Sequence, residues 1–101
     1  MLKVKPLEGY GDLKGTIFDF EAVGDELPKH VHTPQNVHMT VVMRGEIEAS
    51  SHDWSRRVKA GGIIKFRAGE PHAITALKRN TRILNITMMM GPNANTASTA
   101  V

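Results

Sequence analysis

Residues 24–45 read GDELPKHVHTPQNVHMTVVMRG, a stretch in which three histidines fall between two glycines. His30 and His32 are separated by one residue, so on a β-strand both rings would project from the same face. His38 follows in a run rich in β-branched residues, on the face that it shares with Thr40. Two histidines separated by one residue, as His30 and His32 are, can occupy two neighbouring positions around one metal ion. The stretch therefore predicts a strand-based histidine site.

A second stretch, residues 61–76, carries the fourth histidine of the set. It reads GGIIKFRAGEPHAITA, with His72 directly after a turn rich in Gly and Pro and at the start of an alternating segment. If the strands roll up with their histidine faces inward, four imidazoles meet inside one barrel. The fifth histidine, His52, lies in a polar turn and is predicted to be a surface residue.

The rest of the chain is typical of short strands separated by turns. Gly and Pro divide it into pieces too short for most helices. Strands are predicted at 16–22, 37–44, 47–49, 54–58, 63–66, 73–77 and 82–90, with 1–5 as an added strand in the same barrel or on a partner subunit. Strands at this spacing indicate an all-β sandwich, jelly roll or barrel. We expect one domain over residues 1–90 and a flexible tail over 91–101, which is made mostly of Ala, Asn, Ser and Thr.

The composition describes one soluble globular domain. Hydrophobic residues make up 41% of the 101 residues and charged residues 23%, which excludes wholesale disorder. No window approaches ~18 uninterrupted apolar residues, so no membrane-spanning helix is expected. The absence of cysteine excludes a disulfide framework, a thiolate nucleophile and a Cys-based zinc site, and a cytoplasmic location is expected.

The charge gives no reason to expect a nucleic-acid or membrane partner. Thirteen Lys and Arg against ten Asp and Glu give a net charge of +3, and only residues 56–59 are locally dense in basic side chains. None of the five aromatic residues lies in a run typical of an RNA-binding motif. We interpret residues 56–59 as a solvated, positively charged edge strand.

The first stretch resembles the first motif of the cupin superfamily, which runs Gly, five residues, His-x-His, three or four residues, Glu, six residues, Gly. The chain has Gly24, His30, His32 and Gly45 in this order, with His38 at the place of the Glu. The spacer before the third ligand is one residue longer than usual. The stretch is therefore similar to the four-histidine cupins rather than to the majority, which have three His and one Glu.

The second stretch resembles the second cupin motif, which runs Gly, five residues, Pro-x-Gly, two residues, His, three residues, Asn. Gly61, Gly69 and His72 match, while Arg67 and Ala76 replace the Pro and the Asn. Fifteen residues separate the two motifs, the short spacing typical of small microbial cupins. The resemblance implies an all-β fold, a single double-stranded β-helix or jelly-roll barrel. It also implies one divalent transition metal ion held by the four histidines His30, His32, His38 and His72.

The metal and the reaction stay open at this point. Imidazole suits Fe, Mn, Ni, Zn and Cu, and four neutral ligands leave the charge of the ion uncompensated, which favours a small anionic or enolisable substrate in the barrel. Side chains placed to assist are few: Gln35, Thr40 and Glu70 are the candidates for a catalytic role. Because few side chains are placed to transfer protons, chemistry carried by the metal or by bound oxygen is favoured, which is typical of oxygenases. A metal-dependent sugar isomerase or ring-opening enzyme, and a non-catalytic cupin that binds a sugar or another small molecule, are the alternatives.

A homodimer is expected, because a barrel of this length buries a limited core and leaves edge strands to cover. The N-terminal strand and the outer sheet around Trp54 are the two predicted interfaces.

Overall fold

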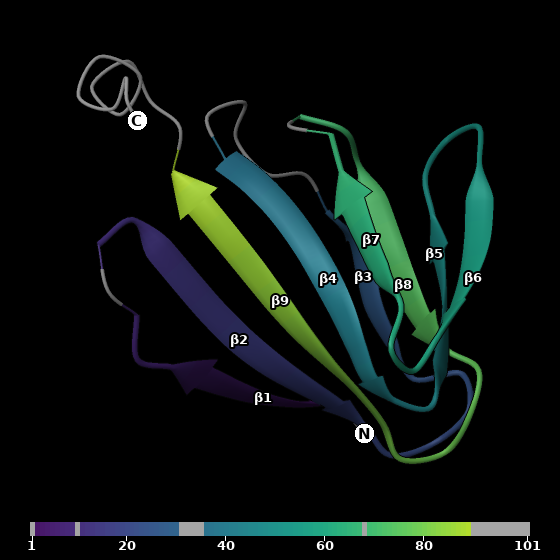
Figure 1. The fold of residues 1–101 in the computed structure, drawn as a ribbon. Helices are drawn as coiled ribbons and strands as arrows, with labels where there is room; N and C mark the ends of the chain where they lie inside the picture. Colours follow the sequence, from purple (N-terminus) through teal and green to yellow (C-terminus); the bar gives the residue numbers. More distant parts are fainter. Residues whose placement is uncertain (1, 10, 31–35, 68, 90–101) are drawn as a thin grey trace.

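The computed structural model describes residues 2–9, 11–30, 36–67 and 69–89, which form nine strands and no helix (Figure 1). Across the five-stranded sheet the order is β1 (Leu2–Leu7), β2 (Leu13–Phe20), β9 (Thr81–Met89), β4 (Asn36–Arg44) and β7 (Ile63–Phe66). Across the four-stranded sheet it is β3 (Glu26–His30), β8 (His72–Ala76), β5 (Glu46–Ser50) and β6 (Ser55–Lys59). All neighbouring strands pair antiparallel. The all-β fold expected from the sequence is confirmed.

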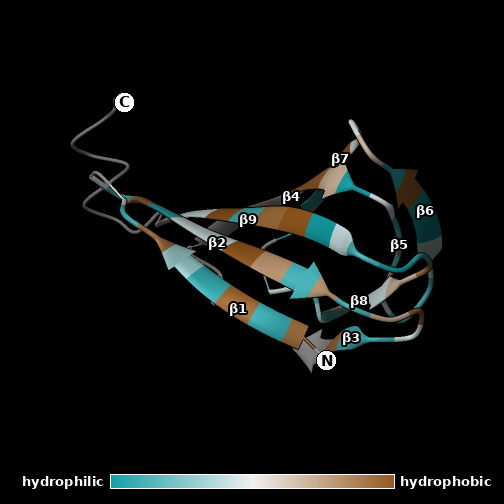
Figure 2. Cartoon of the chain, turned by 90° about the horizontal axis from the view of Figure 1, so that it is seen from below, coloured by the Kyte–Doolittle hydropathy of each residue, from teal (hydrophilic) through white to brown (hydrophobic). Residues whose placement is uncertain are grey.

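The two sheets face each other and bury the inward side chains of both. Hydrophilic and hydrophobic residues alternate along the strands (Figure 2), as a sheet with one buried face requires. In β8, for example, His72, Ile74 and Ala76 are buried while the two residues between them are half-buried. The apolar core contains Phe20, Val42, Ile47, Ala49, Ile64, Phe66, Ile74, Ala76 and Ile83.

The chain changes sheets at a tight turn between β4 and β5. Gly45 in this turn has φ +85°, and a Cβ placed there would lie 2.9 Å from the Cα of Thr81. Thr81 is fully buried, and its hydroxyl donates a hydrogen bond to the carbonyl of Lys78 at 2.8 Å. Only glycine therefore fits this crossing between the two sheets.

Several boundaries differ from the predicted ones. β2 ends at Phe20 rather than at residue 22, because Asp25 closes a turn in which its amide donates to the Ala22 carbonyl (3.2 Å) and its carboxylate accepts from the Ala22 amide (3.1 Å). The N-terminal strand pairs with β2 of its own chain, from Leu2 opposite Phe20 to Leu7 opposite residue 15. The predicted tail, residues 91–101, lies outside the described residues. Within the described residues, no helix is long and apolar enough to cross a membrane.

Candidate metal centre

Two of the four predicted ligands meet between the two sheets. His38 comes from β4 and is 2% exposed, and His72 comes from β8 and is fully buried. Their ring centroids lie 4.9 Å apart. Phe66 of β7 stacks on His72 with a centroid distance of 3.9 Å and an interplanar angle of 9°, and lies 5.2 Å from His38. Histidines that are far apart in the sequence thus share one aromatic, water-poor environment.

The orientation of the His72 ring is set by the loop before it. Nδ1 of His72 lies 3.1 Å from the carbonyl oxygen of Glu70. A carbonyl oxygen only accepts, so Nδ1 carries the proton and Nε2 presents the lone pair. Histidines that bind metals commonly donate their other ring N–H to a backbone carbonyl, which fixes the tautomer in the same way. His72 therefore has the protonation pattern that ligation through Nε2 requires.

The other two predicted ligands are described only in part. His30 is the last residue of β3, and its backbone pairs with His72 in the β3–β8 register. Directly opposite residues of an antiparallel pair have Cα atoms about 4.5–5.5 Å apart, so this backbone position borders the site. The side chain of His30, and the whole of His32 and Gln35, lie outside what the structure describes. Within the described part of the chain, no group of three or more His, Cys, Asp or Glu residues forms a metal cluster, so the four-ligand set stays a prediction.

A buried polar pair lies beside His38. Thr40 follows His38 on the inward face of β4, is fully buried, and donates its hydroxyl proton to Oδ1 of Asn85 at 2.6 Å. Asn85 of β9 is 7% exposed and lies directly opposite Thr40 in the β4–β9 register. The bond uses the Thr40 proton and the Asn85 oxygen, so the donors left on the pair are the Asn85 Nδ2 hydrogens.

Sequence reasoning missed Asn85. The alternation along β9 contained the signal. Asn85 shares the parity of the buried residues Thr81 and Ile83, which places its polar side chain on the buried face of the strand.

Glu70 contacts the site through its backbone rather than through its carboxylate. Oε2 of Glu70 accepts a hydrogen bond from Nε1 of Trp54 at 2.9 Å, and this bond is the main reason why the pKa of Glu70 lies below its usual value. The hydroxyl of Ser51 donates to the Pro71 carbonyl at 2.5 Å. Two hydrogen bonds therefore tie the loop before His72 to the turn between β5 and β6. No sequence signal links residues this far apart.

The buried polar side chains among the described residues are all uncharged or histidine. They are His38, Thr40, His72, Thr81 and Asn85. With no buried Asp or Glu among those residues, the described interior offers imidazole, hydroxyl and amide groups as its polar chemistry.

Comparison with solved structures identifies the architecture. KdgF from Halomonas sp. is 17% identical, with a TM-score of 0.79 over 91% of this chain and 82% of that one. An RmlC-like cupin protein from Desulfovibrio desulfuricans is 24% identical, with a TM-score of 0.77 over 86% of this chain and 81% of that one. A cupin superfamily protein from Desulfitobacterium hafniense is 18% identical, with a TM-score of 0.77 over 88% of this chain and 78% of that one.

These likenesses establish the fold. The chain has the cupin fold, as a single β-barrel domain. No protein-family model matches the sequence. No curated protein matches it by sequence either.

Proposed function

We propose that this protein is a cupin that binds one divalent transition metal ion through His30, His32, His38 and His72. The observation that carries the proposal is the pair His38 and His72, buried from opposite sheets with ring centroids 4.9 Å apart. The tautomer set by the Glu70 carbonyl supports it, because it directs the His72 lone pair to Nε2. When bound, such an ion supplies Lewis-acid chemistry or oxygen-dependent redox chemistry.

The side chains around the histidines suit a small organic substrate. Phe66 forms a flat apolar wall that keeps water from the rings. Thr40 and Asn85 supply buried hydrogen-bonding groups that would orient a hydroxyl or carboxylate of a substrate. Four neutral imidazoles favour an anionic or enolisable compound, because its charge compensates the charge of the ion.

Oxygenase-type catalysis is the reaction class that we favour. The described interior has no buried carboxylate to carry a proton between substrate atoms. Gln35 stays a catalytic candidate from the sequence, and Thr40 from its position beside His38. Glu70 stays the third candidate, with its carboxylate bonded to Trp54 and its carbonyl to His72. The alternatives are a metal-dependent isomerase or ring-opening enzyme, and a cupin that binds a sugar or another small molecule without turnover.

Metal content tests the proposal directly. We expect the protein purified without added ions to contain close to one equivalent of a transition metal by mass spectrometry. His38→Ala and His72→Ala should each lower the bound metal at least about tenfold, because each removes an inner ligand. The matched control is His52→Ala, which changes an exposed histidine of the turn before β6 and should leave the metal content unchanged.

Two results would contradict the proposal. One is a wild-type protein without metal that also fails to take up Fe, Mn, Ni, Zn or Cu in calorimetric titrations. The other is an equal metal content in His72→Ala and His52→Ala. Oxygen consumption of the loaded protein with small diketones, flavonols and uronates then separates a catalyst from a binding protein.

We also propose that two copies form a dimer through the outer face of the five-stranded sheet. Trp54, at one of the two predicted interfaces, is turned toward Phe66 and Glu70 and is half-buried in its own chain. The outer face of the other sheet is the more apolar surface. Its exposed apolar side chains are Leu7, Leu13, Met43, Ile63 and Met88.

A further inference from the structure

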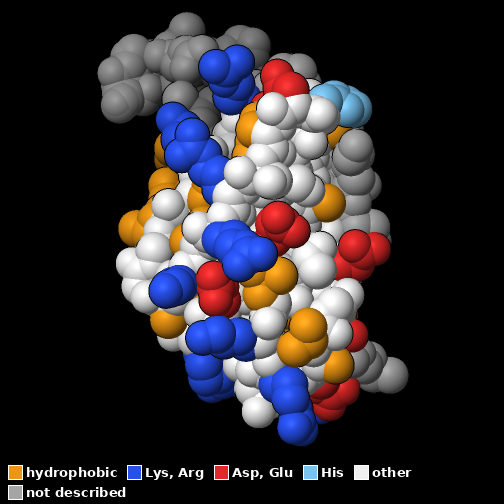
Figure 3. All heavy atoms as spheres, turned by 90° about the vertical axis from the view of Figure 1, so that its right-hand side faces the viewer, with side chains coloured by type: hydrophobic (Ala, Val, Ile, Leu, Met, Phe, Trp, Pro, Cys, Tyr) orange, Lys and Arg blue, Asp and Glu red, His pale blue; other side chains and the backbone are white. Residues whose placement is uncertain are grey.

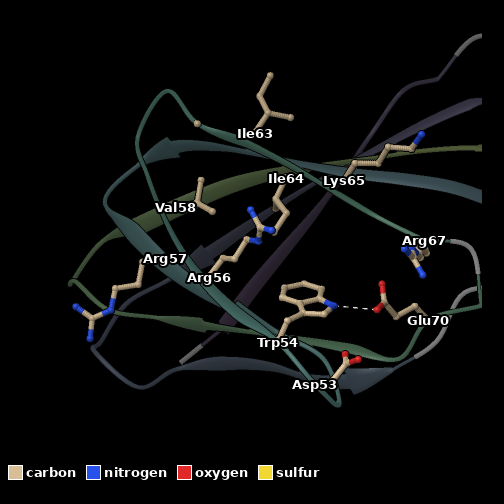
Figure 4. A pocket seen from close by; sticks show the side chains of 11 residues that line it. Asp53, Trp54, Arg56, Arg57, Val58, Ile63, Ile64, Lys65, Arg67 and Glu70 are labelled. Atoms are coloured by element: carbon tan, nitrogen blue, oxygen red, sulfur yellow. Dashed lines mark hydrogen bonds between the residues drawn. The ribbon is translucent and has the colours of Figure 1, made fainter.

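A groove of about 740 Å³ lies where the edges of the two sheets approach each other, between β6 and β7 (Figure 4). Each of these strands has a neighbour on one side only, since β6 ends the four-stranded sheet and β7 ends the five-stranded sheet. The groove is separate from the candidate metal centre. Trp54 lines the groove, and Phe66 stacks between Trp54 and His72.

Basic residues from both edges line the groove. Arg56 comes from β6, Lys65 from β7 and Arg67 from the residue after β7, and all three line it. Figure 4 shows Arg56 beside Ile64, Lys65 and Arg67 on the β7 side, and Arg57 extending away from all three. Figure 3 faces this side of the molecule and shows Lys and Arg side chains along it. Lys65 and Arg67, from β7 and the residue after it, thus add to the positive charge that residues 56–59 bring to this side of the molecule.

These cations form no close ion pair in the described chain, although Arg67 attracts the Glu70 carboxylate electrostatically. The described ion pairs use Lys3, Arg44, Lys78 and Arg82, and none of them involves a cation of the groove. The lining includes four Lys or Arg residues against Asp53 and Glu70, a net charge of +2. The carboxylate of Glu70 already accepts the indole N–H of Trp54.

Apolar side chains lie among the polar ones that line the groove. Ile64 is 8% exposed, Val58 packs on the core, and Trp54 rests on Phe66 with a centroid distance of 6.0 Å. Apolar walls lower the local dielectric constant, so charges at the rim attract a counter-charge more strongly than isolated surface charges do. Guanidinium groups hold carboxylates and phosphates through paired hydrogen bonds.

We propose that this groove binds a small organic anion with two or more carboxylate or phosphate groups. Arg56, Lys65 and Arg67 hold the anionic groups, and the apolar or planar part of the ligand lies against Trp54 and Ile64. The site is distinct from the metal centre and does not depend on the metal.

The chain supplies its own probe, because Trp54 is its one tryptophan and lines the groove. The full-length protein, freed of metal with a chelator, is titrated with benzene-1,3,5-tricarboxylate, with inorganic pyrophosphate and with the neutral benzene-1,3,5-tricarboxamide. Calorimetry gives the affinity and Trp54 fluorescence gives the location. We expect saturable binding of at least one anion with a matching change in fluorescence, and no binding of the triamide. The better of the two anions distinguishes a carboxylate ligand from a phosphate ligand.

Variants identify the cations. Arg56→Gln and Lys65→Gln should each weaken binding about fivefold or more, because each removes a charge-assisted hydrogen bond. Lys59→Gln removes the same charge from β6 outside the groove lining and should change the affinity less than about twofold. Circular dichroism confirms that each variant is folded.

Three results would overturn the proposal. They are no saturable binding of either anion, equal weakening by Lys59→Gln and Arg56→Gln, and binding of the triamide as tight as that of the tricarboxylate.

Discussion

At the scale of single residues, Gly45 shows how one position permits the fold. Its φ of +85° is in the left-handed region, and Thr81 occupies the space into which a Cβ would point. Gly61 has a similar φ of +90°, but a Cβ at that position would meet nothing within 4 Å. The two glycines share the left-handed backbone conformation and differ in the space around them.

We predict that Gly45→Ala is clearly more destabilising than Gly61→Ala. At Gly61 the substitution costs only the left-handed conformation, about 1 kcal/mol. At Gly45 it adds the displacement of buried Thr81, and we expect a total loss of about 3 kcal/mol. Urea denaturation of the two variants measures the difference. Equal losses would show that Thr81 yields without cost and that the crossing turn does not require glycine.

The histidine positions show what residue patterns can predict about a site. Because side chains alternate along a strand, the sequence alone placed His38 with Thr40 and Val42, and His72 with Ile74, and all five are buried. The hydrogen bond between Trp54 and Glu70 could not be predicted in this way. It depends on how the turn after β5 meets the loop before β8, and that is a property of the strand order.

At the scale of elements, a charged cluster joins three strands of the larger sheet. Asp19 of β2 accepts two hydrogen bonds from Arg82 of β9, at 2.7 and 3.0 Å. Arg44 of β4 lies 3.7 Å from the same carboxylate. The hydrogen bond from Arg82 is the main cause of a lowered pKa of Asp19, and both arginines add electrostatic attraction. The cluster fixes the register of β2 on β9 at the end of the sheet where Asp19 lies opposite Arg82.

We predict that Asp19→Asn reduces the loss of stability in acid. A carboxylate whose pKa is lower in the folded than in the unfolded chain stabilises the fold above the unfolded value, near 3.8. That contribution is lost as the pH falls through the folded pKa. The free energy of unfolding between about pH 5 and pH 2 should therefore fall less steeply in the variant than in the wild type.

Asp12→Asn, in the exposed turn before β2, is the control and should keep the wild-type slope. A wild-type slope in Asp19→Asn as well would show that the pair contributes nothing to stability.

The strands themselves were largely predictable, but their partners were not. Alternation and turn residues located β4, β5, β7, β8 and β9 to within a few residues. The N-terminal segment could equally have paired with a second subunit, since nothing local selects among unpaired edges. Its actual partner, β2 of the same chain, follows from which edge of the folded sheet is open. The end of β2 was also missed, because the Asp25 turn that stops it depends on a side chain bonding back to the main chain.

At the scale of the whole molecule, the two faces of the five-stranded sheet have different partners. The inner face is covered by the four-stranded sheet. The outer face carries a row of directly paired apolar residues, Ile17, Leu84, Val41 and Ile63, one from each of β2, β9, β4 and β7. A shallow hollow of about 240 Å³, lined by Leu7, Leu13, Leu84 and Ile86, continues the apolar surface toward β1. Nothing in the described chain covers this face.

The size of this face fits a second copy of the chain. Five strands about 4.8 Å apart and about 25 Å long present roughly 600 Å² in projection, close to the ~800 Å² that each partner buries in a standard interface. Exposed apolar patches on soluble proteins commonly mark interaction sites. Two copies meeting through the same face would bury it symmetrically, as in most homodimers.

We predict that the double variant Met43→Glu, Ile63→Glu is a folded monomer, while the wild type has twice the mass of the 11.1 kDa chain in light scattering. Both side chains lie on the outer face, with exposures of 48% and 63%, so the new carboxylates cost little in the monomer and are buried only in the dimer. Val23→Glu is the matched control, since Val23 is 61% exposed but lies in the turn between β2 and β3, away from the face. It should remain a dimer. A monomeric wild type would contradict the dimer itself. A dimeric double variant would show that the interface lies elsewhere, and the open edges of β1 and β6 would then be the candidate interfaces.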